Sequence, residues 1–104
     1  MSYTLRFLPE VEGDVMAAYS WYEDKAVGLG AEFLRGFYAH TAVLQRTPLI
    51  FSKVHLDFRR GLLRRFPYAC YYRIRGDFVI VYGAFHCARD PSKVSESLGV
   101  RHSR

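Results

Sequence analysis

A chain of 104 residues has room for one hydrophobic core, so residues 1–104 are expected to form a single domain. Hydrophobic residues make up 50% of the chain and aromatic residues 16%, which excludes an intrinsically disordered protein. The charge is split between the two halves. Residues 1–52 hold four Lys/Arg and six Asp/Glu (net −2), whereas residues 53–104 hold eleven and four (net +7), and this asymmetry favours an anionic partner such as RNA, DNA or an acidic protein segment.

The N-terminal part of the chain predicts a strand followed by a helix. Residues 3–8 alternate between apolar and polar side chains, as in a short strand that Pro9 ends. Pro9 then suits the first turn of a helix, which is also acidic. One face of this helix is apolar at helical spacing and carries Val11, Val15, Ala18, Tyr19 and Tyr22.

A second helix is expected over residues 31–45, after a turn that two glycines mark within residues 27–30. The residue before a proline is pushed out of helical geometry, so Thr47-Pro48 ends this helix. Its apolar face carries Phe33, Phe37, Thr41 and Leu44. Two helices joined by so short a turn predict an antiparallel helical hairpin.

Strand patterns follow over residues 58–66, 68–74 and 78–85. Gly76-Asp77 predicts a tight turn between the last two strands. We therefore expect an α+β fold: a strand, a helical hairpin, and then a three-stranded antiparallel meander, with both helices packed on one face of the sheet. The opposite face is expected to stay open to solvent or ligand, and the polar tail, residues 92–104, to be frayed or ordered only by a partner.

Cofactor and metal sites are not expected. Cys70 and Cys87 form no Cys-x-x-Cys pair, and the four histidines have no ligand-like spacing on one element. The longest apolar run, residues 78–85, is too short to cross a bilayer, and the first residues do not form a long apolar signal segment. These features favour a cytoplasmic protein without membrane contact.

Four motifs, in order and on the matching predicted elements, resemble the RelE/ParE superfamily of bacterial toxins over residues 3–91. They are Trp21-Tyr22-Glu23 with Gly28-Leu29-Gly30 and Phe33, then Arg64-Arg65-Phe66-Pro67-Tyr68, then Tyr71-Tyr72-Arg73, and last His86-Cys87-Ala88-Arg89-Asp90-Pro91. The Phe-Pro-Tyr and His-x-x-Arg-Asp-Pro patterns look closer to the ParE-like, plasmid-stabilisation branch.

The resemblance implies the toxin component of a type II toxin–antitoxin module, which a cognate antitoxin neutralises. ParE-type members inhibit growth by binding DNA gyrase and are not nucleases. RelE-type members are mRNA interferases, which cut messenger RNA mostly on the ribosome and without a metal. The resemblance leaves open whether the chain forms a homodimer or a hetero-oligomer with the antitoxin.

Metal-free RNA cleavage needs a base, a cation for the phosphate and an acid, and the candidates for these roles are Arg59, Arg65, His86 and Arg89. On one strand Arg59 is expected to point with Arg65, and Arg60 with Arg64. The alternative is that the arginines face an acidic antitoxin or solvent. In that case His86 orders the end of the last strand and Arg89 pairs with Asp90.

Candidate contacts to a partner or to RNA are Trp21, Arg60, Arg64, Tyr72 and Arg73. Arginines bind phosphates and carboxylates bidentately, and tyrosines stack on bases, although in adjacent strands they more often pack across the sheet. Because Trp21 and Tyr22 are adjacent on a helix, they do not both face the core, and one is expected to be exposed under the antitoxin.

Three functions stay open from the sequence. The first is a non-catalytic toxin that binds gyrase or another protein. The second is a metal-independent, ribosome-dependent mRNA endoribonuclease, so whether the chain is an enzyme is undecided. The third is a degenerate member that only binds a partner protein or DNA. Only two lysines, Lys53 and Lys93, lie beyond residue 26, and no tyrosine follows Tyr82. Both features depart from RelE-like nucleases and favour the non-catalytic toxin.

Overall fold

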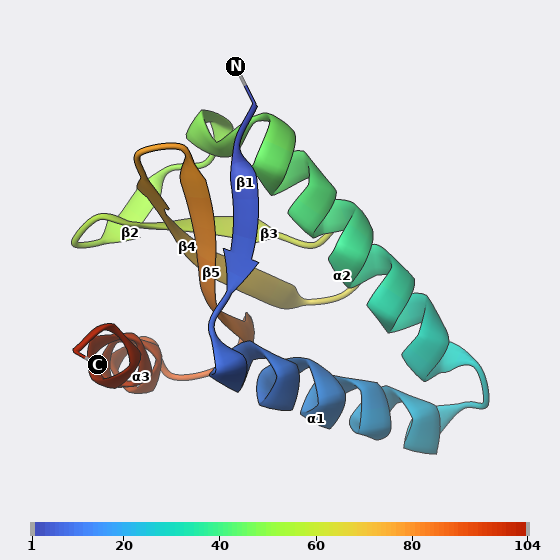
Figure 1. Ribbon diagram of the computed structural model, residues 1–104. Coiled ribbons are helices and arrows are strands. Elements are labelled where there is room, and N and C mark those ends of the chain that lie inside the picture. Colours follow the sequence, from blue (N-terminus) through green and yellow to red (C-terminus); the bar gives the residue numbers. More distant parts are fainter. Residues whose placement is uncertain (1, 104) are drawn as a thin grey trace.

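The computed structural model describes residues 2–103, which form a sheet with two helices against one face and a third against the other (Figure 1). Along the chain the elements are β1 (Thr4–Phe7), α1 (Pro9–Lys25), α2 (Leu29–Arg46), the 3₁₀ turn η1 (Pro48–Ile50), β2 (Lys53–His55), β3 (Phe58–Leu62), β4 (Tyr68–Arg75), β5 (Phe78–His86) and α3 (Pro91–His102). The strand order is β1-β5-β4-β3-β2. β1 lies parallel to β5, and the other pairs are antiparallel. The α+β class and the meander β3-β4-β5 are confirmed.

The helical hairpin forms as predicted, although α2 begins at Leu29 rather than at residue 31. Gly28 makes the turn with a φ of +88°, in the left-handed region that glycine adopts at no steric cost. The Glu23 carboxylate accepts hydrogen bonds from the backbone N–H groups of Gly28 and Gly30, both at 2.9 Å. An acceptor at this position satisfies the free donors that begin α2.

The main core lies between the hairpin and one face of the sheet. Phe33, Phe37 and Leu44 of α2 are buried, and they pack with Val15 of α1 and Tyr72 of β4. Full burial of one such side chain contributes about 1.5–3 kcal/mol. Both helices therefore cover the same face, as the two apolar stripes predict.

The prediction of a frayed tail and an open second face is wrong. Residues 91–102 form α3, which Asp90 caps by accepting a hydrogen bond from the Ser92 backbone N–H. Residue 104 lies outside the described residues. Val94 and Leu98 of α3 cover a second cluster on the sheet, formed by Phe58, Ala69, Tyr71, Tyr82 and Phe85. Val94, Leu98 and the exposed Val100 are a weak helical signal in a polar segment, and only the sheet face gives Val94 and Leu98 a surface to cover.

An ion pair fixes α3 to the other layers. Arg101 of α3 donates to both carboxylate oxygens of Asp14 in α1, at 2.7 and 2.9 Å, and to the Tyr82 carbonyl at 2.8 Å. The two charged side chains are only 14% and 12% exposed. The Asp14 carboxylate also accepts from the Ala84 backbone N–H of β5. The C-terminal helix is thereby tied to α1 and β5.

The strand predicted over residues 58–66 is too long. β3 ends at Leu62, and residues 63–67 turn the chain into β4, while the short edge strand β2 was not predicted. A turn breaks the alternation of side chains, so the expected pairing of Arg59 with Arg65 and of Arg60 with Arg64 on two strand faces does not hold. Within residues 2–103, no helix is long and apolar enough to cross a membrane.

Candidate functional site

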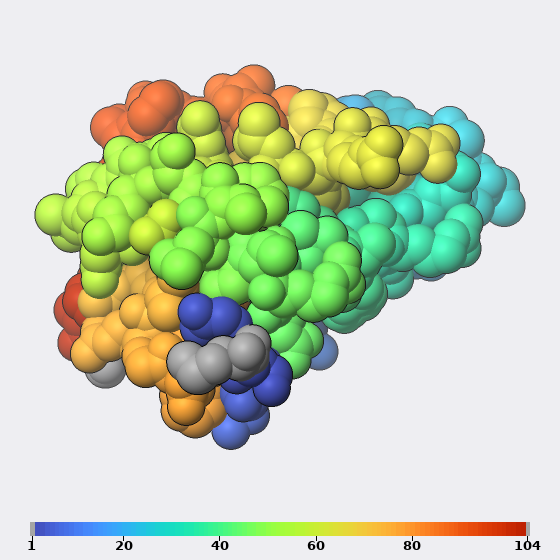
Figure 2. All heavy atoms as spheres, turned by 90° about the horizontal axis from the view of Figure 1, so that it is seen from above, coloured from blue at the N-terminus to red at the C-terminus, as the bar shows by residue number. Residues whose placement is uncertain are grey.

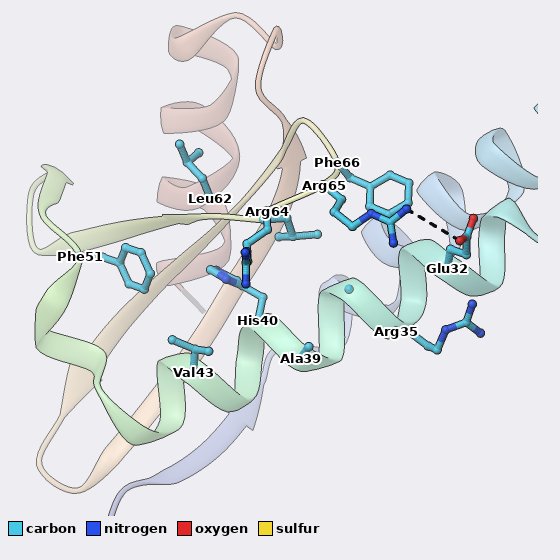
Figure 3. A pocket seen from close by; sticks show the side chains of 12 residues that line it. Glu32, Arg35, Ala39, His40, Val43, Phe51, Leu62, Arg64, Arg65 and Phe66 are labelled. Atoms are coloured by element: carbon cyan, nitrogen blue, oxygen red, sulfur yellow. Dashed lines mark ion pairs between the residues drawn. The ribbon is translucent and has the colours of Figure 1, made fainter.

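A groove runs between α2 and the segment that follows β3 (Figure 3). In Figure 2 the atoms of this segment, in yellow, lie along those of α2, in green to turquoise. The groove has a volume of about 800 Å³. Its α2 wall is a helical stripe of Glu32, Arg35, Gly36, Ala39, His40 and Val43, and the other walls are Phe51, Leu62, Leu63, Arg64, Arg65 and Phe66.

The rim of the groove is positively charged. Arg35 and Arg64 make no ion pair or side-chain hydrogen bond with any residue between 2 and 103. Arg65 reaches Glu32 only at 4.0 Å, with 77% of its side chain exposed, and an exposed pair at this distance contributes little. Three arginines are therefore available to an anionic partner.

His40 closes the inner side of the groove against β3. His40 as a whole residue is 8% exposed, and its Nε2 atom is buried without a hydrogen-bond partner in the described part of the chain. The ring lies against the backbone of Gly61, where no Cβ intervenes. Burial lowers the pKa of His40, because the charged ring loses its hydration, so the neutral form prevails at neutral pH. His40 was not among the residues predicted from the sequence, because it lies beside the apolar stripe of α2.

We expect Gly61→Ala to lower the free energy of unfolding by about 1–3 kcal/mol. A Cβ at Gly61 would lie 2.7 Å from His40 Nε2 and 3.2 Å from Leu44 Cδ2, so α2 and β3 would have to separate. Urea denaturation measures the loss. In a His40→Ala background the same substitution should cost clearly less, and an equal cost in both backgrounds would show that His40 is not the obstacle.

Acid should destabilise the fold through His40. Its folded pKa lies below the ordinary value of 6.5, so the contribution of the neutral ring is complete above about pH 6.5 and is lost as the pH falls toward the folded pKa. Unfolding measured from about pH 7 down to about pH 5 should show a fall in stability that is smaller in His40→Leu. Identical pH profiles for the two proteins would contradict this role.

Two of the four expected catalytic residues, Arg59 and His86, do not lie together. Arg59 lies opposite Tyr72, and His86 lies opposite Tyr68, on the two sides of β4. Four residues along a strand span about 13 Å, so the Cα atoms of Arg59 and His86 are more than about 10 Å apart. Arg59 donates to the Phe51 carbonyl at 2.6 Å and is half-buried.

His86 and Arg89 serve the end of β5. The Nδ1 atom of His86 accepts from the Ala88 backbone N–H at 3.0 Å, which is the ordering role given as the alternative. Arg89 lies 4.7 Å above the Phe85 ring and donates to Ser97 at 3.4 Å. It does not pair with Asp90, because that carboxylate caps α3, and hydrogen bonds from Ser92 lower the pKa of Asp90.

Two of the five expected contact residues are buried and do not fit that role. Tyr72 is fully buried, its hydroxyl donates to the Pro48 carbonyl, and burial raises its pKa to about 12. Arg73 is 7% exposed and donates to both oxygens of Asp57, at 2.8 and 2.7 Å. An alternating pattern does not reveal this burial in the sequence, because α2 and α3 cover both faces of β4 and residues 69–73 are all buried.

The other three contact candidates lie at the surface. Arg60 and Arg64 are exposed. Trp21 is 55% exposed with the Lys25 amine 4.6 Å from its ring, whereas its neighbour Tyr22 is buried. One of the two adjacent aromatic residues is therefore exposed, as expected.

Arg73 also joins a polar cluster that the sequence did not reveal. Its Nη1 lies 2.8 Å from His102 Nδ1 of α3 and 3.3 Å from the Tyr82 hydroxyl. Arginine has no acceptor, so His102 Nδ1 accepts this hydrogen bond. The hydrogen bond from Arg73 lowers the pKa of Asp57. A carboxylate, a cation and a histidine thus meet where α3 ends on the sheet.

No family model matches the sequence, and neither does any curated protein. Solved structures do match the fold. A chain of the chromosomal ParDE toxin–antitoxin system from P. aeruginosa superposes with a TM-score of 0.69 at 18% identity, covering 81% of this chain and 95% of that one. A chain of the toxin–antitoxin complex RelBE2 from Mycobacterium tuberculosis gives 0.57 at 20% identity, covering 83% and 99%. The protein is thus a small α+β domain with a groove rimmed by arginines. Its fold is the RelE/ParE fold.

Proposed function

We propose that this chain is the toxin component of a type II toxin–antitoxin module, that a cognate antitoxin neutralises it, and that it inhibits growth by binding a protein target such as DNA gyrase. The observation that carries the proposal is the match of 81% of the chain to a ParDE chain that is itself covered to 95%. The arginine-rimmed groove supports a protein partner, since three cations without strong internal partners can bind acidic side chains.

Two features support a non-catalytic mode. Arg59 and His86 lie on opposite sides of β4, and His86 Nδ1 is occupied by a backbone N–H. General acid–base catalysis requires groups within hydrogen-bond reach of one reacting phosphate. A surface that binds protein has no such requirement.

The alternative is a metal-independent mRNA endoribonuclease acting on the ribosome. One observation favours it, namely the Asp57–Arg73–His102 cluster, which places a histidine beside a carboxylate and a cation. The guanidinium of Arg73 is largely occupied by Asp57, which limits its use for a phosphate. A third possibility is a degenerate member that binds only a partner.

Induction of the chain in a bacterium that lacks its antitoxin tests the proposal. We expect growth to stop, to resume on co-expression of the product of the adjoining gene, and to stop equally with His86→Ala and His102→Ala. Normal growth with the wild-type chain would favour the degenerate binder. Loss of arrest in a folded His102→Ala variant would favour the nuclease.

A further inference from the structure

The β2–β3 turn consists of Leu56 and Asp57, and it holds Leu56 in a conformation that leucine rarely adopts. Leu56 has a φ of +52°, and no other non-glycine residue between 2 and 103 has a positive φ. The first residue of a two-residue hairpin turn needs this geometry, which is why glycine or asparagine usually stands there. A leucine is strained at this position because its Cβ lies too close to a backbone carbonyl oxygen.

A second two-residue turn of the same sheet shows the unstrained solution. Gly76 and Asp77 join β4 to β5, and Gly76 has a φ of +58°, close to that of Leu56. In both turns an aspartate follows the residue with positive φ. The chain thus has glycine at one of these positions and leucine at the other, although both need the same backbone geometry.

Burial does not offset the strain at Leu56. The residue is 75% exposed, and neither cluster of buried residues in the described chain includes it. Val54, on the adjoining strand β2, is 45% exposed. Strained non-glycine residues persist where the surrounding structure fixes them, and they gather at functional sites. The exposed leucine side chain is therefore expected to act on a molecule outside the chain.

The residues after Leu56 hold the turn in place. The two carboxylate oxygens of Asp57 accept hydrogen bonds from Nε and Nη2 of Arg73 in β4, at 2.8 and 2.7 Å. The Arg73 side chain is only 8% exposed, and Phe58 is buried with the His55 ring stacked on it. A side chain presented on so rigid a turn loses little conformational freedom when it binds a partner.

The position and charge of the turn indicate which partner it fits. In Figure 1 the β2–β3 turn projects on the left, whereas the turn of the helical hairpin lies at the far right. Residues 53–57 hold one lysine and one aspartate, and Leu56 is not a groove residue. Nucleic-acid binding requires several cations against the phosphates, which this turn lacks. An exposed aliphatic side chain on an uncharged turn fits an apolar pocket of a protein.

We propose that the β2–β3 turn is the surface with which this chain binds the protein target whose inhibition stops growth, and that Leu56 inserts into an apolar pocket of that target. This assignment rests on the proposed function. It leaves the arginine-rimmed groove to an acidic partner, so that the target and the antitoxin are bound by different surfaces. Full burial of one leucine side chain corresponds to about ten- to a hundredfold in affinity.

Thermal unfolding followed by circular dichroism tests the strain. Leu56→Gly should raise the midpoint by about 2–5 °C, because relief of the strain exceeds the effect of the greater freedom of glycine in the unfolded chain. Gly76→Leu is the matched control and should lower the midpoint by a similar amount, although a Cβ at Gly76 meets no atom within 4 Å. A lower midpoint for Leu56→Gly would show that the leucine stabilises the fold, and would overturn the proposal.

Induction in a bacterium without the antitoxin tests the function of the side chain. Leu56→Gly should need about ten- to a hundredfold more soluble protein per cell than the wild type to halve the growth rate. The less stable Gly76→Leu should need no more than the wild type, and Leu56→Met, which keeps an apolar side chain, should retain most of the arrest. Equal potency of Leu56→Gly and the wild type would contradict the inference.

Three further results would assign the turn to another occupant and so overturn the proposal. Weaker binding of the purified product of the adjoining gene to Leu56→Gly, measured by titration calorimetry, would assign the turn to the antitoxin. A wild-type dimer that Leu56→Gly dissociates, seen by analytical ultracentrifugation, would assign it to a second copy of the chain. Codon-phased cuts in messenger RNA that Leu56→Gly no longer makes would assign it to the ribosome.

The two proposals fail in different ways. A wild-type chain that does not stop growth loses the proposed function, and the target-binding role of the turn with it. A wild-type chain that stops growth no more potently than Leu56→Gly keeps the proposed function and loses the turn as its binding surface.

Discussion

Replacement of Arg101 by leucine should lower the free energy of unfolding by about 3–5 kcal/mol. The substitution leaves the Asp14 carboxylate buried without its counter-ion and removes the hydrogen bond to the Tyr82 carbonyl. Loss of one partner from a buried pair is costly because the remaining charge stays desolvated. Urea denaturation followed by circular dichroism measures the effect.

Two controls give this prediction its meaning. Arg75→Leu, at an exposed position, should change stability by no more than about 0.5 kcal/mol. The double variant Asp14→Leu/Arg101→Leu should be more stable than the sum of the single losses implies, because no lone charge remains. A stability of Arg101→Leu equal to that of the Arg75→Leu control would mean that the C-terminal segment is a frayed tail after all.

The second large effect concerns charge. Arg64→Glu/Arg65→Glu should weaken binding of the proposed antitoxin about a hundredfold, because each reversal replaces an attraction at the groove rim by a repulsion of similar size. Titration calorimetry with the purified product of the adjoining gene measures the loss. Growth arrest by the variant should then resist neutralisation.

The matched control reverses two arginines near the β4–β5 turn, away from the groove. Arg6 lies over the Phe78 ring beside the β4–β5 turn, and Arg75 lies at the start of that turn. Arg6→Glu/Arg75→Glu therefore changes the net charge of the protein by the same amount as Arg64→Glu/Arg65→Glu, but at a site away from the groove. Equal losses in the two double variants would show that net charge, and not the groove, governs the partner.

Much of the fold follows from local signals in the sequence. Gly76-Asp77 predicts the β4–β5 turn, where Gly76 has a φ of +58°. The glycines before α2 predict the hairpin, and the periodic apolar residues of both helices predict the covered face. These are interactions between near neighbours, so the sequence reveals them directly.

The remaining parts depend on contacts between distant residues. Asp14 and Arg101 are 87 positions apart, and no periodicity connects them. Tyr72 and Arg73 are residue types that often bind partners. Here both are buried, because α2 covers one face of the sheet and α3 covers the other. The groove escaped prediction for the same reason, since it exists only because α2 and residues 62–66 lie side by side.

A map of cellular RNA 5′ ends, taken minutes after induction of the chain in a bacterium without its antitoxin, tests the central claim most directly. A protein-binding toxin predicts growth arrest with intact messenger RNA. Codon-phased cuts in translated messages, absent in the His102→Ala variant, would contradict it and establish a ribonuclease.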